Sequence, residues 1–101
     1  MLKTFRSYQI SVQFYQECAA LKLPRRLKDQ LSRASSSVAL NLAEGYGKTS
    51  FLDKKKFYTT ALGSLRECQA VLDLACVKQS AIRERADHLG ACLYKLVRWS
   101  A

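Results

Sequence analysis

The chain is poor in the residues that punctuate β-rich folds. Its 101 residues include one Pro and four Gly. A β-sandwich needs turn residues every few positions, so this composition excludes a turn-rich β fold and favours helices. With 49% apolar residues the chain has enough hydrophobic material for one core. Its length corresponds to a single domain over residues 1–101.

Motifs for metal binding are also missing. The chain has one His and four Cys, and no two Cys form a Cys-x-x-Cys pair; the residues are His88, Cys18, Cys68, Cys76 and Cys92. A zinc site needs closely spaced His and Cys ligands. We therefore expect no metal and no cofactor. Free Cys behaves as a small hydrophobic residue, so we expect four buried, reduced thiols, as in a reducing cytoplasm.

Long hydrophobic runs are absent as well. No apolar stretch approaches the roughly 20 residues of a membrane span. The first residues, MLKTFRSYQ, lack the apolar core of a signal peptide. The sequence therefore predicts a cytoplasmic protein with no membrane partner.

What the sequence does contain is helical periodicity, with apolar residues recurring every three or four positions in four stretches. We predict helices over about residues 4–22, 25–44 and 51–77, and a fourth that begins at Ser80. Pro24 suits a first helical turn, and Gly45 and Gly47 supply a stop. Ser50 and Asp53 resemble a capping box. Short connections favour antiparallel neighbours, so the predicted fold is all-α, an up-down-up-down four-helix bundle.

The first predicted helix has two apolar faces. One is a repeat that we assign to the core; its members are Phe5, Tyr8, Val12, Tyr15 and Ala19. The other face holds Ile10, Phe14 and Leu21. A helix with two apolar faces needs two neighbours, so we assign the second face to a contact between subunits and predict a homo-oligomer.

Positive charge dominates the surface. The chain has 17 Lys and Arg but only eight Asp and Glu, which gives a net charge of +9. Two basic clusters stand out; the first comprises Lys22, Arg25, Arg26, Lys28 and Arg33, and the second comprises Lys48, Lys54, Lys55 and Lys56. Both lie near predicted helix N-termini, where the helix dipole disfavours cations. Phosphates that bind there would offset this repulsion, so we predict a nucleic-acid surface for RNA or DNA.

The two clusters fall at opposite ends of an up-down bundle. The other basic residues divide between the same ends; Arg83 and Arg85 join the first cluster, and Lys3, Arg6, Lys95 and Arg98 join the second. No base-recognition motif appears, so we expect no strong sequence specificity. Tyr46 and Tyr58 are the candidates for stacking on bases, whereas we assign Phe57 to the core and Phe51 to a cap contact.

Polar residues in the second helix predict assembly. Asn41 borders the apolar face, and we interpret it as a buried polar group that fixes helix register. Glu44 lies in the last turn, where the dipole disfavours an anion, so we expect it to pair with Arg66 or with Arg33 of a neighbouring subunit. Gly63 lies inside the third helix at a cost of about 1 kcal/mol relative to Ala, which predicts a close helix approach there.

Two segments of the chain resemble a known family. Gln30-Leu-Ser-Arg-Ala-Ser-Ser-Ser-Val38 through Asn41-Leu-Ala-Glu-Gly45 is similar to the central signature of the four-helix-bundle proteins encoded in 23S ribosomal RNA intervening sequences. Gly63-Ser-Leu-Arg-Glu67 resembles that family's second signature. The family also includes the accessory variability determinant of diversity-generating retroelements. The resemblance implies a homopentameric barrel and, for the retroelement members, a nucleic-acid-binding surface and a reverse transcriptase partner.

Two functions remain open at the level of the sequence. One is an accessory subunit that binds nucleic acid electrostatically beside a larger enzyme or in a ribonucleoprotein. The other is a structural ring that acts as a scaffold without nucleic acid. Catalysis by Glu44 is a third, weaker interpretation, because no nucleophile, metal set or second acid accompanies it, so we expect a protein that is not an enzyme.

Overall fold

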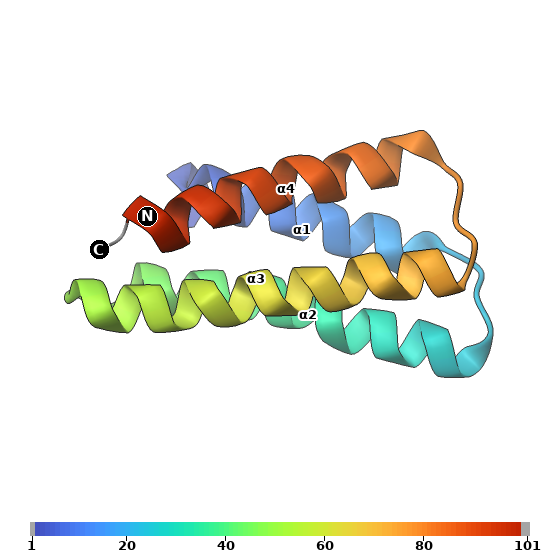
Figure 1. Ribbon diagram of the computed structural model, residues 1–101, viewed down its shortest axis with the longest axis horizontal. Coiled ribbons are helices and arrows are strands. Elements are labelled where there is room, and N and C mark those ends of the chain that lie inside the picture. The colour runs from blue at the N-terminus through green and yellow to red at the C-terminus, as the bar shows by residue number, and fades with distance from the viewer. Residues whose placement is uncertain (1, 100–101) are drawn as a thin grey trace.

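The computed structural model describes residues 2–99 and folds them into a bundle of four long helices (Figure 1). A 3₁₀ turn over Leu2–Thr4 precedes α1 (Arg6–Ala20), α2 (Arg25–Tyr46), α3 (Phe51–Leu74) and α4 (Ser80–Trp99). Each helix packs against the next along the chain, and α1 also packs against α4. The predicted all-α, up-down-up-down bundle is confirmed.

The short connections give the bundle two different ends. The α1–α2 and α3–α4 connections lie at one end, which we name the two-loop end (Figure 1). The start of α1, the α2–α3 connection and the end of α4 lie at the other, which we name the terminal end. Every connection is only a few residues long, at 21–24, 47–50 and 75–79. The basic residues at the helix ends are thereby sorted into two separate surfaces.

Local backbone chemistry explains where α2 and α3 end. Gly47 keeps a right-handed φ of −80°, so α2 continues past Gly45 to Tyr46. Helix α3 stops at Leu74, earlier than predicted, and Cys76 beyond it takes a left-handed φ of 55°. At the start of α3, Ser50 Oγ accepts a hydrogen bond from the backbone N–H of Asp53 at 3.1 Å. This is the first half of the predicted capping box.

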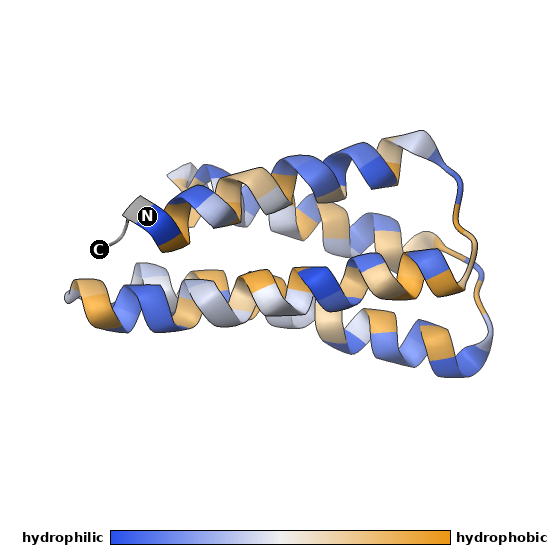
Figure 2. Cartoon of the chain, in the orientation of Figure 1, coloured by the Kyte–Doolittle hydropathy of each residue, from blue (hydrophilic) through white to orange (hydrophobic). Residues whose placement is uncertain are grey.

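The buried face of α1 is the one that we had assigned to a subunit contact. Ile10 and Phe14 are 3% and 0% exposed, and Leu21 is also buried. They join the large buried side chains of the other helices, including Leu31, Leu42, Leu65, Leu72, Leu89 and Leu93. Figure 2 shows hydrophobic positions turned towards the neighbouring helices and hydrophilic ones turned outwards. The assignment to assembly is therefore wrong for this face, which is the core face of α1.

The face of α1 that was predicted to form the core is only partly buried, although Phe5 and Tyr8 pack against the core. Ser7 and Ser11 are buried beside Ile10 and Phe14, and such small side chains allow close packing. The face carrying Tyr8 and Val12 is only half-buried. Sequence spacing places both sets on a helix but does not say which one turns inward.

The close helix approach predicted at Gly63 is also absent. Gly63 is exposed, and a Cβ placed there would have no neighbouring heavy atom within 4 Å. The buried positions of α3 include Ala61 and Leu65, two residues to either side, so Gly63 points away from the core. The close approach lies instead at Gly45 of α2, where a Cβ would stand 2.7 Å from Cε1 of Tyr58.

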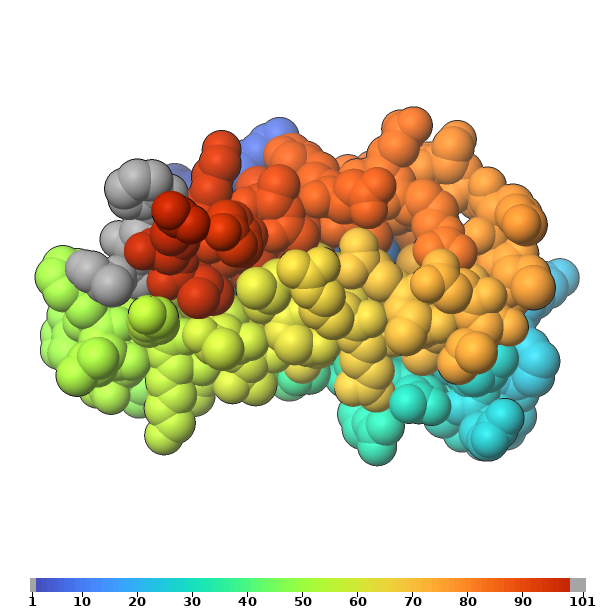
Figure 3. Space-filling model, viewed as in Figure 1, coloured from blue at the N-terminus to red at the C-terminus, as the bar shows by residue number. Residues whose placement is uncertain are grey.

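Helices α3 and α4 form one broad face of the molecule. In the space-filling view this face is hollowed beside the α3–α4 connection (Figure 3). Within residues 2–99, no helix combines the length and hydrophobicity that crossing a bilayer requires.

Candidate nucleic-acid interface

Two of the predicted phosphate-binding lysines are helix caps. Lys28 Nζ donates hydrogen bonds to the carbonyl oxygens of Ala19 at 2.9 Å and Leu21 at 2.7 Å, at the end of α1. Lys54 Nζ does the same at the end of α2, donating to Gly45 at 3.3 Å and Tyr46 at 3.1 Å. Each lysine lies at the start of one helix but reaches the last carbonyls of the preceding one.

This geometry corrects the dipole argument for Lys28 and Lys54. A cation near a helix N-terminus is disfavoured, but one at a C-terminus satisfies open carbonyls and meets the negative end of the dipole. In an antiparallel bundle the N-terminus of one helix adjoins the C-terminus of the previous one. The two lysines are therefore stabilised within the chain and do not require a phosphate.

Other members of the clusters have acidic neighbours. Arg25 pairs with Asp29 at 3.3 Å, and Arg33 lies 3.6 Å from a Glu67 oxygen on α3. Lys48 lies 3.5 Å from Glu44. These pairs are largely exposed, so each contributes little to stability. Four members are exposed and have no acidic partner within the described residues: Lys22, Arg26, Lys55 and Lys56.

Two arginines of α4, Arg83 and Arg85, are neutralised at the two-loop end, where they were predicted to lie. Arg83 Nη1 is 2.7 Å from Asp73 Oδ1, and Arg83 Nε donates to the carbonyl of Val77 at 3.0 Å. Arg85 Nε donates to Glu17 at 2.7 Å. These contacts tie α4 to the end of α3 and to α1.

The positive charge is therefore unequal at the two ends. Four acidic side chains accompany seven basic ones at the two-loop end; they are Glu17, Asp29, Asp73 and Glu84, with Lys22, Arg25, Arg26, Lys28, Lys78, Arg83 and Arg85. Only two acidic side chains accompany eight basic ones at the terminal end; they are Glu44 and Asp53, with Lys3, Arg6, Lys48, Lys54, Lys55, Lys56, Lys95 and Arg98. The remaining charges, halfway along the helices, cancel. The terminal end thus holds +6 of the net charge of +9.

The aromatic side chains at the terminal end differ from the prediction. Tyr46 stacks on Phe5, with ring centroids 4.8 Å apart, and Tyr58 is 3% exposed. Burial and the neighbouring Tyr46 raise the pKa of Tyr58. Phe57 is half-buried with Lys48 over its ring at 5.3 Å. Phe51, assigned from sequence to a cap contact, is 64% exposed. The candidates for stacking are therefore corrected from Tyr46 and Tyr58 to Phe51.

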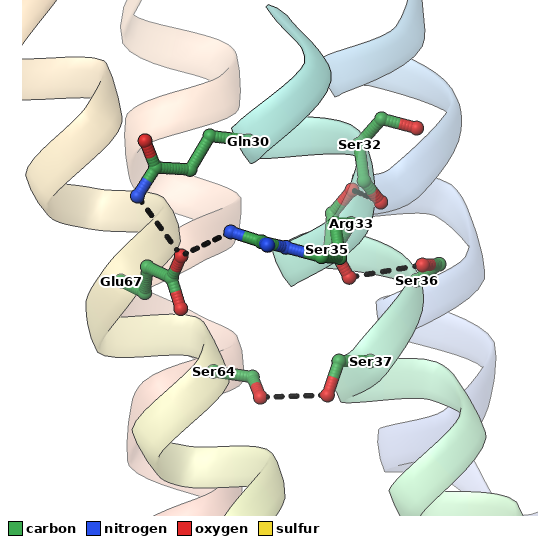
Figure 4. A network of polar contacts seen from close by, with 8 residues as sticks. All are labelled: Gln30, Ser32, Arg33, Ser35, Ser36, Ser37, Ser64 and Glu67. Atoms are coloured by element: carbon green, nitrogen blue, oxygen red, sulfur yellow. Dashed lines mark hydrogen bonds and ion pairs between the residues drawn. The ribbon is translucent and has the colours of Figure 1, made fainter. Parts of the chain in front are cut away.

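Polar contacts across α2 and α3 join the two sequence segments that carried the resemblance (Figure 4). The hydroxyls of Ser37 and Ser64 are 2.8 Å apart. One turn along, the amide of Gln30 donates to Glu67 at 3.2 Å, and Arg33 points to the same carboxylate. The first segment lies on α2 and the second on α3, so these contacts link the two helices.

Asn41 and Glu44 make local contacts. Asn41 is half-buried, and its Nδ2 donates to the carbonyl of Ser37 at 2.9 Å and to the Ser37 hydroxyl at 3.1 Å. It thus supports the hydroxyl that meets Ser64, rather than being fully buried as predicted. Glu44 is exposed and pairs with Lys48, so among the described residues the predicted pair with Arg66 does not form. A pair with Arg33 of a neighbouring subunit stays a prediction.

Comparison with protein families decides what these segments represent. The family model described as 23S rRNA-intervening sequence protein matches residues 3–98. The chain belongs to this family. The match takes in all four helices and both polar segments. Neither the curated proteins nor the solved structures compared with the chain gave a significant match.

Two of the four thiols of this 23S rRNA-intervening sequence family member are buried and weakly acidic. Burial, with a smaller effect of the Glu17 charge, raises the pKa of Cys18 to about 12, and burial also raises the pKa of Cys68. Thiolate is the reactive form, so both side chains are poor nucleophiles. The expectation of four buried thiols is wrong for Cys76, which is exposed, and for Cys92, which is half-buried. Within residues 2–99, no three His, Cys, Asp or Glu side chains are placed to hold a metal.

Proposed function

We propose that this family member is a non-enzymatic, basic, oligomeric protein that binds RNA or DNA through the phosphate backbone. Its role would be that of an accessory subunit to a nucleic-acid enzyme, such as a reverse transcriptase, or to a ribonucleoprotein. The observation that supports this proposal is the concentration of positive charge at the terminal end. Exposed Lys55 and Lys56 there have no acidic partner within the described residues, so they are free to meet phosphates.

The proposed recognition is electrostatic. Phosphates neutralised by Lys and Arg release counterions, and this term contains no sequence information. Membership of a family named for 23S rRNA intervening sequences supports an RNA setting. The retroelement association and the reverse transcriptase partner rest only on the resemblance of the two sequence segments.

The proposed assembly uses the outward face of α1 and α2, in place of the core face predicted from sequence. A shallow hollow of about 150 Å³ lies there, lined by Val12, Tyr15, Ser36, Ala39 and Leu40. Leu40 is 67% exposed at its edge. Such a patch supports self-association, and a pentamer is preferred on the resemblance alone. An oligomer would repeat the basic end and raise affinity through avidity.

The alternative is a ring-forming scaffold with no nucleic-acid ligand. The exposed apolar patch on α1 and α2 is compatible with it. The two functions differ in their response to salt, because phosphate binding weakens steeply as salt rises whereas apolar assembly does not.

The test is an anisotropy titration of labelled RNA and DNA at several salt concentrations. The double variant Lys55→Gln/Lys56→Gln should bind more weakly, and its log–log salt slope should fall by about one unit per lost phosphate contact in each subunit. The matched control is Lys22→Gln/Arg26→Gln, which removes the same charge from the two-loop end and should change binding less. Equal affinity and equal slope in all three proteins would favour the scaffold.

A further inference from the structure

The first turn of α3 exposes two large apolar side chains at the most basic end of the molecule. Phe51 is 64% exposed and Leu52 is 82% exposed. Figure 2 shows this start of α3 as hydrophobic, directly followed by a strongly hydrophilic stretch. The exposure is unusual because a helix normally turns such residues towards the core.

Phe51 differs from the other aromatic side chains at this end. The rings of Phe5 and Tyr46 stack on each other, and Tyr58 is buried. Tyr94 of α4 is 51% exposed, but its hydroxyl accepts a hydrogen bond from Arg98 at 2.9 Å and its ring lies beside the same guanidinium. Phe51 is the most exposed aromatic side chain whose surroundings the structure describes, and it forms no ring contact with the described residues.

Free cations flank this exposed pair. Lys55 follows Phe51 by one helical turn, and Lys56 follows Leu52 by one turn, so each lysine lies on the same side of α3 as an apolar side chain. Both lysines are exposed without an acidic partner in the described part of the chain. Asp53 is the acidic residue of this turn, and its backbone N–H is held by Ser50. The local surface therefore combines an open aromatic face with two positive charges and the single negative charge of the exposed Asp53.

We propose that Phe51 stacks on an unpaired base, and that the preferred ligand of the terminal end is single-stranded nucleic acid. This proposal rests on the proposed function and narrows its ligand class. Every base has a π-face, so stacking on an aromatic ring is favourable without sequence readout. Bases inside a duplex are already stacked on each other and present no free face. Lys55 and Lys56, each about 6 Å further along the helix axis than Phe51 and Leu52, would contact the adjoining phosphates.

The charge of this surface favours single-stranded nucleic acid over two other ligands that an exposed apolar pair suggests, a second copy of the chain and a membrane. If the first turn of α3 from a second copy packed here, its lysines would face Lys55 and Lys56, and like charges that face each other repel. A membrane surface is anionic, but helices that lie on membranes present a long apolar face, whereas here two apolar residues are followed directly by Asp-Lys-Lys-Lys. A single strand supplies both phosphates and unstacked bases.

The experiment compares Phe51→Leu and Phe51→Trp with the wild-type protein. Leu keeps an apolar side chain but removes the aromatic face, and Trp restores it. The probes are dye-labelled oligo(U), oligo(dT) and a mixed-sequence DNA duplex. We expect Phe51→Leu to bind the single strands about ten- to a hundredfold more weakly, and Phe51→Trp to bind them as the wild type does. Duplex binding and the salt slope should change little, because no cation is removed.

The outcomes separate this proposal from the proposed function. If Phe51→Leu binds single strands as the wild type does while Lys55→Gln/Lys56→Gln weakens all binding, stacking is refuted and the electrostatic function stands. If the wild type binds no probe in a salt-dependent manner, the function itself fails, and stacking with it. If Phe51→Leu loses equal affinity for single strands and for the duplex, stacking is also refuted.

Two further measurements test the rival occupants. Light scattering should give the same mass for Phe51→Leu and the wild type, and a lower mass would identify the tip as a contact between copies. Sedimentation with phosphatidylserine-containing vesicles should show no binding that depends on Phe51; such binding, together with unchanged oligo(U) affinity, would assign the tip to a membrane. Circular dichroism should confirm the fold of each variant, as expected for an exposed position.

Discussion

Gly45 is the residue at which α2 and α3 come closest to steric conflict. A Cβ there would lie 2.7 Å and 3.0 Å from two ring carbons of Tyr58, and 3.1 Å from Cβ of Phe57. These neighbours are ring and near-backbone atoms of a packed helix, so they have little room to move. We expect Gly45→Ala to lower the free energy of unfolding by about 1–3 kcal/mol, measured by urea denaturation.

Gly63→Ala is the matched control for this prediction. The same substitution at an exposed helical position adds no contact and removes backbone freedom from the unfolded chain, so it should raise stability by about 0.5–1 kcal/mol. Equal effects at the two glycines would contradict the packing described at Gly45. Sequence alone assigned the close approach to Gly63, because Gly63 lies inside a helical pattern whereas Gly45 looks like a helix stop, and only the fold shows which glycine faces a partner.

At the scale of the elements, Lys28 and Lys54 stabilise helix ends. Lys28 and Lys54 each close the C-terminus of a preceding helix, whereas Lys55, next in sequence, is exposed. We expect Lys28→Met and Lys54→Met each to destabilise the fold by about 1 kcal/mol, because carbonyls that accept a charged donor lose it. Lys55→Met should leave stability within experimental error. Urea denaturation measures all three, and stability unchanged in the first two variants would reject the capping role.

The elements themselves were largely predictable from sequence, whereas their faces were not. Periodicity, Pro24 and Ser50 located four helices to within a few residues, because helix formation is local. The roles of Lys28 and Lys54 depend on which helix end lies next to which, and that is a property of the tertiary fold. The exposure of Phe51 likewise depends on how α3 is rotated about its axis. A pattern that places residues on one face does not specify what that face meets.

In the whole molecule one face of α1 lies in the core and the other faces outwards beside α2. Two substitutions distinguish the role of the core face in folding from the proposed role of the outward face in assembly. Phe14→Ala removes a fully buried ring and should destabilise the monomer by about 3–5 kcal/mol. Leu40→Glu introduces charge at an exposed position and should dissociate the proposed oligomer without unfolding its subunits. Sedimentation velocity combined with circular dichroism measures both effects. Intact assembly in Leu40→Glu would exclude the α1–α2 face as the subunit contact.

The ring of helix contacts also has a kinetic consequence. Among the main helix pairings of residues 2–99, three join neighbours along the chain through very short connections, and the pairing of α1 with α4 joins distant segments. Closing a short loop loses little chain entropy, so each hairpin is able to form before the bundle closes. Chains dominated by such local pairings fold in microseconds to milliseconds. The α2–α3 hairpin, with its serine and Glu67 contacts, is therefore able to form before α1 and α4 meet.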